Sequence, residues 1–364
     1  MTPKEKADRQ KYVPVHITLV PDDETRAILQ KTFDTFILVC NKVSPKMYNK
    51  ALKKKDILVC TQDRMGAADL ANATTRYYLH GVYRYSVAET LIDAYKKKNK
   101  YNQLNRLKQI SFSNKPQNGE IELYAMPITR EATIKVDFKN KICQMDLIDG
   151  RHCIPFIYPE GIPEPPDSWQ ACRGLVKKAA DDWEVIASYE NPMFPVDSNK
   201  VVKHVGVDRG LKNIAATFSK EKGYKRYPQK QYYDKTKPHH TKTEQHRERM
   251  AKDYRVAWEM VNGEPEGTLF ILEDLQFKKR IPGWSYRNFA DWLTFFATLH
   301  HQYIDYCDPH NTSRICPHCG AIMKKRDLKG RFFVCPNPQC GYGKDEYVND
   351  DENAAENICR RGEA

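Results

Sequence analysis

Four cysteines near the C-terminal end constrain the fold of this chain more than any other feature of its sequence. They form two short knuckles, Cys316-Pro-His-Cys319 and Cys335-Pro-Asn-Pro-Gln-Cys340, with fifteen residues between them. Two such knuckles supply the four soft ligands that zinc takes in a tetrahedron, and a glycine follows each pair, where a tight reversal favours positive φ. The spacing therefore predicts one zinc ion held by Cys316, Cys319, Cys335 and Cys340. Because four cysteines close the coordination shell, we expect the zinc to be structural rather than catalytic.

The other seven of the eleven cysteines are scattered, and most have the apolar neighbours typical of small buried residues. The N-terminus is charged and has no apolar signal core, so we do not expect secretion. No run of about eighteen apolar residues exists to span a membrane. The cysteine cluster therefore indicates a metal in a reducing compartment, and we expect a cytoplasmic protein with no membrane partner.

The charge balance favours a polyanionic partner. Lysine and arginine number 59 against 47 aspartate and glutamate, which gives a net charge of +12 and an isoelectric point near 9.0. A surplus of this size is typical of proteins that bind nucleic acid or an anionic membrane. Without a spanning or signal segment, nucleic acid is the leading class of partner. At 364 residues, two or more compact units are expected.

The first two hundred residues read as strands interrupted by helices. "YVPVHITLV" alternates like a strand, and from Asp22 to about Lys115 the apolar residues recur at three and four, as in helices. Alternating runs separated by turn signals return from about Glu120 to Tyr158, as in an antiparallel meander. The most economical interpretation is a β-barrel of residues 1–20 and 116–200, interrupted by a helical lobe of residues 21–115.

The remaining sequence reads as an α/β unit. Strand-like "VVKHVGVDRG", "LKNIAATFS" and "GTLFILEDL" alternate with helical stretches, and the four-cysteine segment falls inside this pattern. We expect an α/β domain of residues 201–311 and 346–364, with a zinc ribbon of residues 312–345 inserted. The predicted fold class is therefore multidomain α+β.

Three acidic positions could converge at one edge of this domain. Asp208 and Glu273 end apolar strands, with Asp274 as a competitor for Glu273, and Asp350 and Asp351 open the terminal helix. Taken singly, each could be a turn residue or a helix cap. Together, hard carboxylate ligands of this kind hold magnesium. Two such ions about 4 Å apart can activate water and stabilise the leaving oxygen in phosphodiester hydrolysis.

Four stretches, in this order, resemble the RuvC-type nuclease domain of the insertion-sequence TnpB proteins and the related compact type V CRISPR effectors. They are "GVDRGLKNIAATFS", "LFILEDL", "DPHNTSRICPHCG" with "CPNPQCGY", and "DDENAAENI". The resemblance implies an RNase H-like fold, with Asp208, Glu273 rather than Asp274, and Asp351 as the catalytic metal ligands. Asp350 is then the neighbour that opens the helix.

The same resemblance implies an RNA-guided, magnesium-dependent endodeoxyribonuclease. Its partners would be a guide RNA and double-stranded target DNA, with a short flanking DNA motif read by the protein. Two magnesium or manganese ions would lie at the nuclease site, and one structural zinc in a ribbon that binds target nucleic acid. The barrel and helical lobe would be the family's wedge and recognition regions, in a monomer or homodimer acting at the nucleoid of a prokaryotic cytoplasm. The stretch between Asp208 and Glu273 is short for the family, and the second knuckle has four intervening residues rather than the commoner two.

Several cations are candidates for contact with nucleic acid. Amides and aromatic residues are interleaved with the lysines of "YKKKNKYNQLNRLKQ", as on surfaces that face nucleic acid, although a solvated helix face gives a similar pattern. The candidates are Lys96, Lys97, Lys98, Lys278, Lys279, Arg280 and Arg314.

Two other functions fit parts of the sequence. One is an RNA-guided DNA-binding protein or repressor that no longer cuts, although this chain keeps all three acids. The other is a guide-independent zinc-ribbon DNA-binding factor that assists transposition. Magnesium-dependent cleavage would exclude the first, and dependence on RNA would exclude the second.

Overall fold

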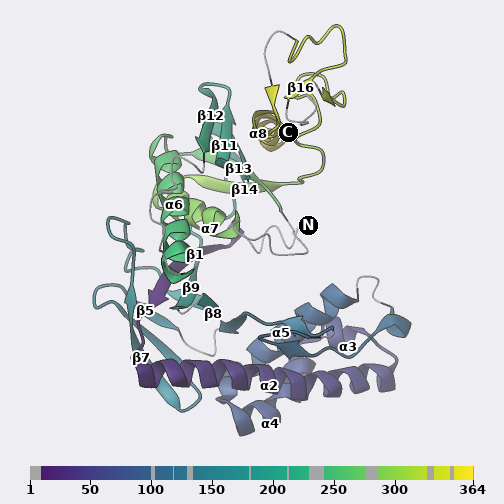
Figure 1. Cartoon of the computed structure of the whole chain (residues 1–364), viewed down its shortest axis with the longest axis vertical. Coiled ribbons are helices and arrows are strands. Elements are labelled where there is room, and N and C mark those ends of the chain that lie inside the picture. Colours follow the sequence, from purple (N-terminus) through teal and green to yellow (C-terminus); the bar gives the residue numbers. More distant parts are fainter. Residues whose placement is uncertain are drawn as a thin grey trace. The chain divides into compact units, whose positions relative to one another are not determined.

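The computed structural model describes residues 10–99, 103–117, 119–128, 134–179, 182–210, 213–228, 242–275, 286–325, 332–344 and 348–363. The chain forms two compact units, Val15–Tyr189 and a second made of Met1–Pro14 with Glu190–Ala364 (Figure 1). Each is described by itself. In the described part of the chain, no helix combines the length and the apolar character needed to cross a membrane.

A seven-stranded sheet, in the order β4-β8-β9-β1-β7-β6-β5, dominates the N-terminal half of the chain. Its strands are β1 (Tyr12–Leu19), β4 (Ala125–Ile128), β5 (Lys135–Asp137), β6 (Ile142–Leu147), β7 (Gly150–Ile157), β8 (Ala171–Ala179) and β9 (Asp182–Glu190). The predicted strand content and meander are confirmed. The predicted barrel is not found in the residues described, because the edge strands β4 and β5 do not pair with one another. The sheet is therefore open.

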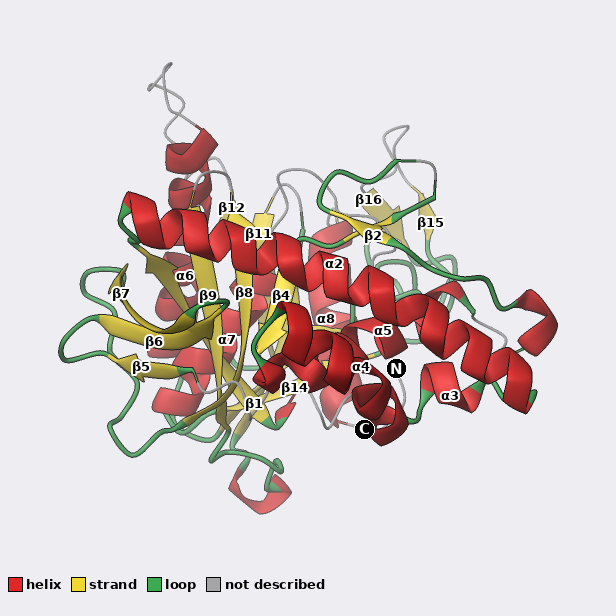
Figure 2. Ribbon diagram, turned by 90° about the horizontal axis from the view of Figure 1, so that it is seen from below, coloured by secondary structure: helices red, strands yellow, loops and turns green. Residues whose placement is uncertain are grey.

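Four helices account for the helical part of this half. They are α2 (Asp23–Lys54), α3 (Leu58–Thr61), α4 (Arg64–Tyr78) and α5 (Arg84–Lys98), with the short helices η1 (Gly81–Tyr83) and η2 (Leu104–Arg106). Figure 2 shows α2 as a long helix beside α4 and α5. The side chain of Asp22 caps α2 by accepting from the N–H of Thr25 at 2.7 Å.

Helix α5 ends before the predicted limit of the helical lobe. The buried Asn99 donates its side-chain amide to the carbonyl of Gln103 at 3.0 Å. Two short strands, β2 (Phe112–Ser113) and β3 (Ile121–Glu122), then pair in parallel. Local side-chain bonding of this kind competes with helix continuation, which the spacing of apolar residues does not reveal.

A five-stranded sheet forms the centre of the C-terminal half, in the order β12-β11-β10-β13-β14. Its strands are β10 (Lys203–Asp208), β11 (Asn213–Ser219), β12 (Gly223–Pro228), β13 (Thr268–Glu273) and β14 (Tyr303–Cys307). Strands β10, β11 and β12 are antiparallel, whereas β10, β13 and β14 run parallel. Every residue of β13 is buried, as expected for a central parallel strand with both faces covered.

Among the described residues, this unit has three α-helices, α6 (Lys242–Asn262), α7 (Tyr286–Leu299) and α8 (Asp350–Glu363), and one short helix, η3 (Ser198–Lys200). Helix α8 packs mainly against β10 and β11 and also meets β13 and β14. At Gly206, an added Cβ would lie 2.0 Å from the carbonyl oxygen of Ala355 and 2.4 Å from the nitrogen of Cys359. Only glycine allows the two backbones to approach this closely.

A small three-stranded sheet holds the cysteine knuckles. It consists of β15 (Lys324–Lys325), β16 (Phe332–Val334) and β17 (Val348–Asn349), in that order. Two of the cysteines share its core with three apolar side chains: Cys316, Cys335, Met323, Phe333 and Val348. Strand β17 runs straight into α8, so the cysteine module and the terminal helix are continuous in the chain.

Candidate functional site

Two of the predicted acids lie side by side because their strands run parallel and in register. Val207 of β10 pairs with Leu272 of β13, so Asp208 and Glu273 end neighbouring strands at the same edge. Glu273 is only 7% exposed and Asp208 is half-buried. The sheet therefore places two carboxylates together in a desolvated position.

The third acid reaches the same place through α8. Asn349 caps the helix, with its side-chain oxygen accepting from the N–H of Asp351 at 2.9 Å, and Glu352 reaches back to the N–H of Asn349 at 3.4 Å. These bonds form a capping arrangement that does not use the Asp351 carboxylate. That carboxylate instead accepts from the side-chain amide of Asn213, at the start of β11, at 2.5 Å.

The three acids act on one another electrostatically. Burial raises the pKa of Asp208 well above its ordinary value, and the charges of Glu273 and Asp351 raise it further, with Arg209 opposing them. Burial also raises the pKa of Glu273, against the hydrogen bond from Thr312 and the charge of Arg209. Clustered anions in a desolvated position favour either protonation or a bound cation.

The donor set suits a hard divalent cation, because all three groups are carboxylates. Their oxygens are nevertheless less closely gathered than the cysteine sulfurs. Within the described ranges, the four cysteines are the one group of three or more ligand residues close enough together to hold a metal ion.

Three further residues support the acids, and the sequence analysis did not identify them. The buried guanidinium of Arg209 donates to the backbone carbonyl of Glu273, and the buried hydroxyl of Thr312 donates to Oε1 of Glu273. Asn213 holds Asp351 as described above. Arg209 directly follows the first acid and Thr312 lies shortly before the first knuckle, but neither position carries a pattern that marks this role.

Asp274 also lies at the end of β13. It is 5% exposed, and its N–H donates to the carbonyl of Cys307 at 2.9 Å, which continues the pairing of β13 with β14. The choice of Glu273 over Asp274 stays a prediction.

The four cysteines gather as their spacing predicted. Their sulfur atoms all lie within 4.8 Å of one another, with 3.6 Å between those of Cys316 and Cys340 and 3.4 Å between those of Cys319 and Cys335. Gly320 and Gly341 take φ values of 73° and 70°, so both knuckles turn where glycine was expected to be needed. The N–H of Ala321 helps to lower the pKa of Cys319 to about 7, which favours the thiolate. This arrangement could bind one zinc ion.

A buried glutamate links the cysteine module to α8. Glu356 is 3% exposed and accepts from the hydroxyl of Tyr342 at 3.1 Å, while Arg360 of the same helix donates to it at 2.8 Å. The ring of His318, inside the first knuckle, lies 3.3 Å from the same carboxylate. Tyr224 of β12 also donates to it. Residues from both knuckles, the sheet edge and the helix therefore converge on one carboxylate.

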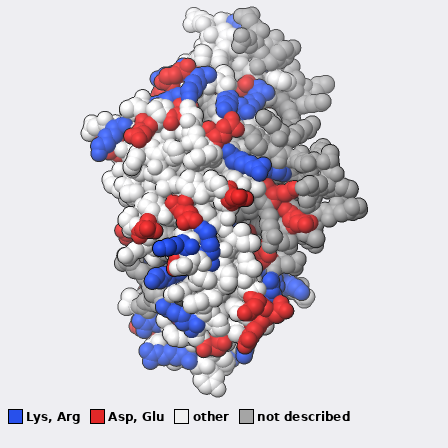
Figure 3. Space-filling model, turned by 90° about the vertical axis from the view of Figure 1, so that its left-hand side faces the viewer, with Lys and Arg blue, Asp and Glu red and all other residues white. Residues whose placement is uncertain are grey.

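The predicted nucleic-acid contacts are placed only in part. Arg314 is exposed just before the first knuckle, and Lys96, Lys97 and Lys98 are exposed in the last turn of α5. Lys278, Lys279 and Arg280 lie outside the described residues. Figure 3 shows one face of the molecule with basic and acidic side chains interspersed rather than gathered. The role of these cations stays a prediction.

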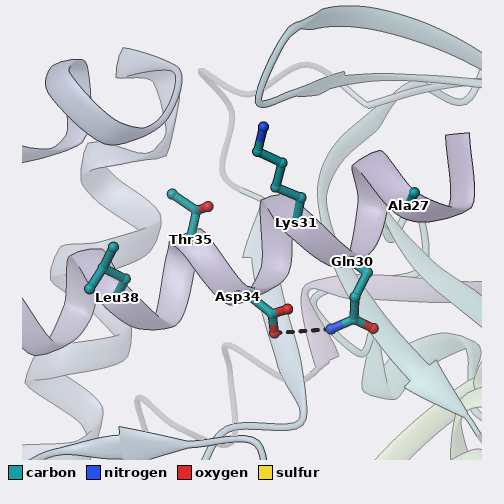
Figure 4. Close-up of a pocket in the computed structure, with 6 residues that line it drawn as sticks. All are labelled: Ala27, Gln30, Lys31, Asp34, Thr35 and Leu38. Atoms are coloured by element: carbon teal, nitrogen blue, oxygen red, sulfur yellow. Dashed lines mark hydrogen bonds between the residues drawn. The ribbon is translucent and has the colours of Figure 1, made fainter. Parts of the chain in front are cut away.

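A hollow of about 480 Å³ lies along α2, lined by Ala27, Gln30, Lys31, Asp34, Thr35 and Leu38 (Figure 4). All six residues come from one helix, and the amide of Gln30 donates to Asp34 at 3.0 Å. None of the acids or cysteines discussed above lines it, so it gives no second candidate for the chemistry.

Comparisons with known proteins gave one family match, in the C-terminal half, and several similar solved structures. Residues 286–358 match the family model described as Cas12f1-like, TNB domain. A search of curated proteins gave no match. Among solved structures, the chain is similar to a Cas12f1–sgRNA–target DNA complex, with 15% identity, a TM-score of 0.49, and 93% of this chain and 83% of the other covered.

Two further solved structures are similar to the chain. A CRISPR–Cas12f ternary complex shows 15% identity and a TM-score of 0.33, covering 93% of this chain and 85% of the other. The C2c1 protein of Alicyclobacillus acidoterrestris with single-guide RNA shows 10% identity and a TM-score of 0.33, covering 93% and 69%. The family match spans α7, β14, the cysteine module and the start of α8 with Asp351. Residues 286–358 are thus similar to the Cas12f1-like TNB domain family, which confirms the predicted resemblance of the chain to the TnpB-like and compact type V effectors.

Proposed function

We propose that this protein is an RNA-guided DNA endonuclease whose catalytic acids are Asp208, Glu273 and Asp351. The observation that supports the proposal is that Asp208 and Glu273 end neighbouring parallel strands and that Asp208 feels the charge of Asp351, which lies within the stretch that matches the Cas12f1-like TNB family model. We assign residues 201–311 and 346–364 to an RNase H-like domain of the RuvC type. The zinc ribbon is residues 312–345.

The carboxylates fit a pair of magnesium or manganese ions, since hard oxygen donors in a desolvated site are what these ions select. When bound, such ions would supply a nucleophilic water and stabilise the departing oxygen of a phosphodiester. The chain's own residues prepare the site. Thr312 and Arg209 fix the end of β13 at Glu273, and Asn213 orients Asp351. Burial raises the pKa values of Asp208 and Glu273, and a bound cation would favour their ionised forms.

Guide RNA and double-stranded DNA are the partners that we propose, on the basis of the family match and the net charge of +12. The open sheet and helices of the N-terminal half would serve as the wedge, residues 1–20 and 116–200, and the recognition lobe, residues 21–115. The four cysteines would hold one structural zinc.

The first test is to purify the protein after expression with its native flanking DNA and to sequence the RNA that accompanies it. One dominant RNA with a fixed scaffold and a guide-like end would name the DNA target. That complex should then cut the matching duplex in the presence of Mg²⁺ and not in EDTA. Absence of any discrete RNA from a folded protein would contradict guidance by RNA.

Two variants then test the acids. Asp208→Ala should abolish cleavage while guide and target binding stay within about twofold of wild type. Asp274→Asn is the matched control, since it removes a neighbouring buried charge that the proposal leaves out of the site. The acids would be wrongly assigned if the Asp208→Ala complex still cut DNA. They would also be wrongly assigned if only Asp274→Asn lost cleavage.

A further inference from the structure

Side chains on one face of α8 form hydrogen bonds with the backbone of the segment that leads into the first knuckle. Asn353, Asn357 and Arg361 are four residues apart, so their side chains project from the same side of the helix. We call these three residues the α8 clamp. Each donates to backbone carbonyls of residues 308–315, the connection between β14 and the first knuckle.

Two of the α8 clamp residues donate to the same pair of backbone carbonyls. The amides of Asn353 and Asn357 both donate to the carbonyl of Ile315, at 3.0 and 2.7 Å, and both reach the carbonyl of Thr312, at 3.3 and 2.9 Å. Arg361 donates to the carbonyl of His310 at 2.8 Å and to that of Asp308. The two asparagines are 0% and 7% exposed, so these bonds satisfy groups that would be costly to bury alone.

The segment held by the α8 clamp contains Thr312, whose hydroxyl contacts the acidic site. Thr312 is 3% exposed, and its Oγ1 donates to Oε1 of Glu273, with the carbonyl of Pro309 as a second acceptor at 3.2 Å. The carbonyl of Thr312 is one of the two that the clamp asparagines hold. The backbone of Thr312 is thus fixed from one side while its side chain fixes Glu273 on the other.

We propose that Thr312 is a positioning residue for Glu273, and that the α8 clamp sets its place. Because α8 also begins with Asp351, one helix then sets the geometry of two of the three acids. The inference rests on the proposed function, in which Glu273 is a metal ligand. Hydrogen-bonding partners of metal ligands commonly change metal affinity or activity by 10- to 100-fold when they are removed.

Two substitutions separate the hydroxyl from the shape of the side chain. Thr312→Val keeps the shape and removes the donor, whereas Thr312→Ser keeps the donor and removes a methyl group. The readout is calorimetric titration of the zinc-loaded full chain with Mn²⁺ alone, followed by guided DNA cleavage. Thr312→Val should weaken Mn²⁺ binding at least 10-fold and slow cleavage by a similar factor, with Thr312→Ser within about threefold of wild type.

Thr294→Val is the matched control. Thr294 is a buried threonine of α7 whose hydroxyl bonds within its own helix, to Ala290 at 2.8 Å. This variant should bind Mn²⁺ and cut DNA as the wild type does. If Thr312→Val does not fold, Thr312→Cys against Thr312→Ser makes the same comparison, because a thiol is a weak donor in nearly the same volume.

The outcomes distinguish the inference from the function beneath it. A wild type that binds Mn²⁺ no more tightly than Asp208→Ala would overturn the proposed metal site, and the inference would fall with it. A wild type that binds Mn²⁺ at the acids, together with a Thr312→Val variant that binds equally well, would overturn the inference alone. The inference would also be overturned if Thr312→Val stayed active while Thr312→Ser was impaired, because the shape of the side chain and not its hydroxyl would then matter.

Discussion

The cysteine module could bind zinc and the acidic site is our proposed magnesium site, yet the two are assembled in opposite ways. The cysteines lie within one short stretch of chain, and their sulfur atoms are within 4.8 Å of one another. The acids come from residues 208, 273 and 351, and they repel one another across a sheet edge. The cysteines are brought together by local turns of the two knuckles, whereas the acids are brought together by the parallel pairing of two strands and by the packing of a distant helix. We therefore expect the ribbon to depend on a bound ion for its stability, and the acidic site to depend on the fold for its shape.

The largest expected effect comes from removing zinc. Structural zinc contributes about 10–16 kcal/mol to the folding of small modules. Strong chelation, or Cys335→Ser, should unfold the ribbon while the five-stranded sheet persists. Hydrogen exchange by mass spectrometry should show fast exchange in residues 332–344 and continued protection of β13. Unchanged protection of the ribbon after the loss of zinc would contradict a metal-dependent module.

Gly206→Ala tests whether the acidic site depends on the surrounding fold for its shape. The new methyl group would lie 2.0 Å from the carbonyl oxygen of Ala355, so α8 must move away from β10 and take Asp351 with it. A displacement near 1 Å can cost about 100-fold in rate, and overpacking of this kind costs about 1–3 kcal/mol in the free energy of unfolding. Cleavage rates and thermal unfolding would measure the two effects.

Gly263→Ala is the control for that change, because the nearest atom to its new methyl group would lie at 3.3 Å. It should cut DNA at close to the wild-type rate. Equal rates for Gly206→Ala and wild type would mean that the close approach of α8 does not set the place of Asp351.

This contrast explains which parts of the molecule could be predicted from sequence. The knuckles were predictable because ligand spacing and two glycines encode them locally. Glu273 and Asp208 could be predicted as strand ends, but their adjacency depends on the parallel register of Val207 with Leu272. Thr312 and the clamp asparagines lie inside the stretches that carry the family resemblance, but the sequence did not indicate what they contact. The clamp bonds run to backbone carbonyls that any residue could supply, and the bond from Thr312 to Glu273 depends on the tertiary fold. Likewise, the expected barrel required β4 to meet β5, and alternating apolar residues do not determine that pairing.

The raised pKa values of the acids predict that the site destabilises the metal-free protein. A carboxyl whose pKa is higher in the folded than in the unfolded state stabilises the fold while it is protonated. That stability is present below the unfolded pKa, near 4, and is lost as pH rises through the raised pKa of Asp208. Each tenfold difference in proton affinity corresponds to about 1.4 kcal/mol.

Asp208→Asn should therefore increase the melting temperature of the zinc-loaded, magnesium-free protein at pH 7.5, and the gain should shrink toward pH 4. Added Mg²⁺ should reduce the difference in melting temperature between the variant and the wild type, because it should stabilise the wild type alone. Differential scanning calorimetry across this pH range measures both trends. A variant that is less stable than the wild type at pH 7.5 would count against a strained cluster of anions.

The smallest effect is expected where the two regions meet, at Glu356. Glu356→Gln keeps an acceptor for Tyr342 but removes the charge that faces His318 and Arg360, so about 1–2 kcal/mol of unfolding free energy should be lost. The acids themselves stay in place, because Asn349 and Asn213 hold Asp351 independently of this contact. Cleavage should therefore fall less than tenfold, with the loss appearing in the concentration of DNA needed for half-maximal cleavage rather than in the maximal rate.

Glu363→Gln is the control. Glu363 of the same helix forms a surface ion pair with Lys220 at 2.7 Å, and such pairs contribute about 0–1 kcal/mol. A loss in maximal rate as large as that of Gly206→Ala would mean that the ribbon, and not the sheet alone, fixes the position of Asp351.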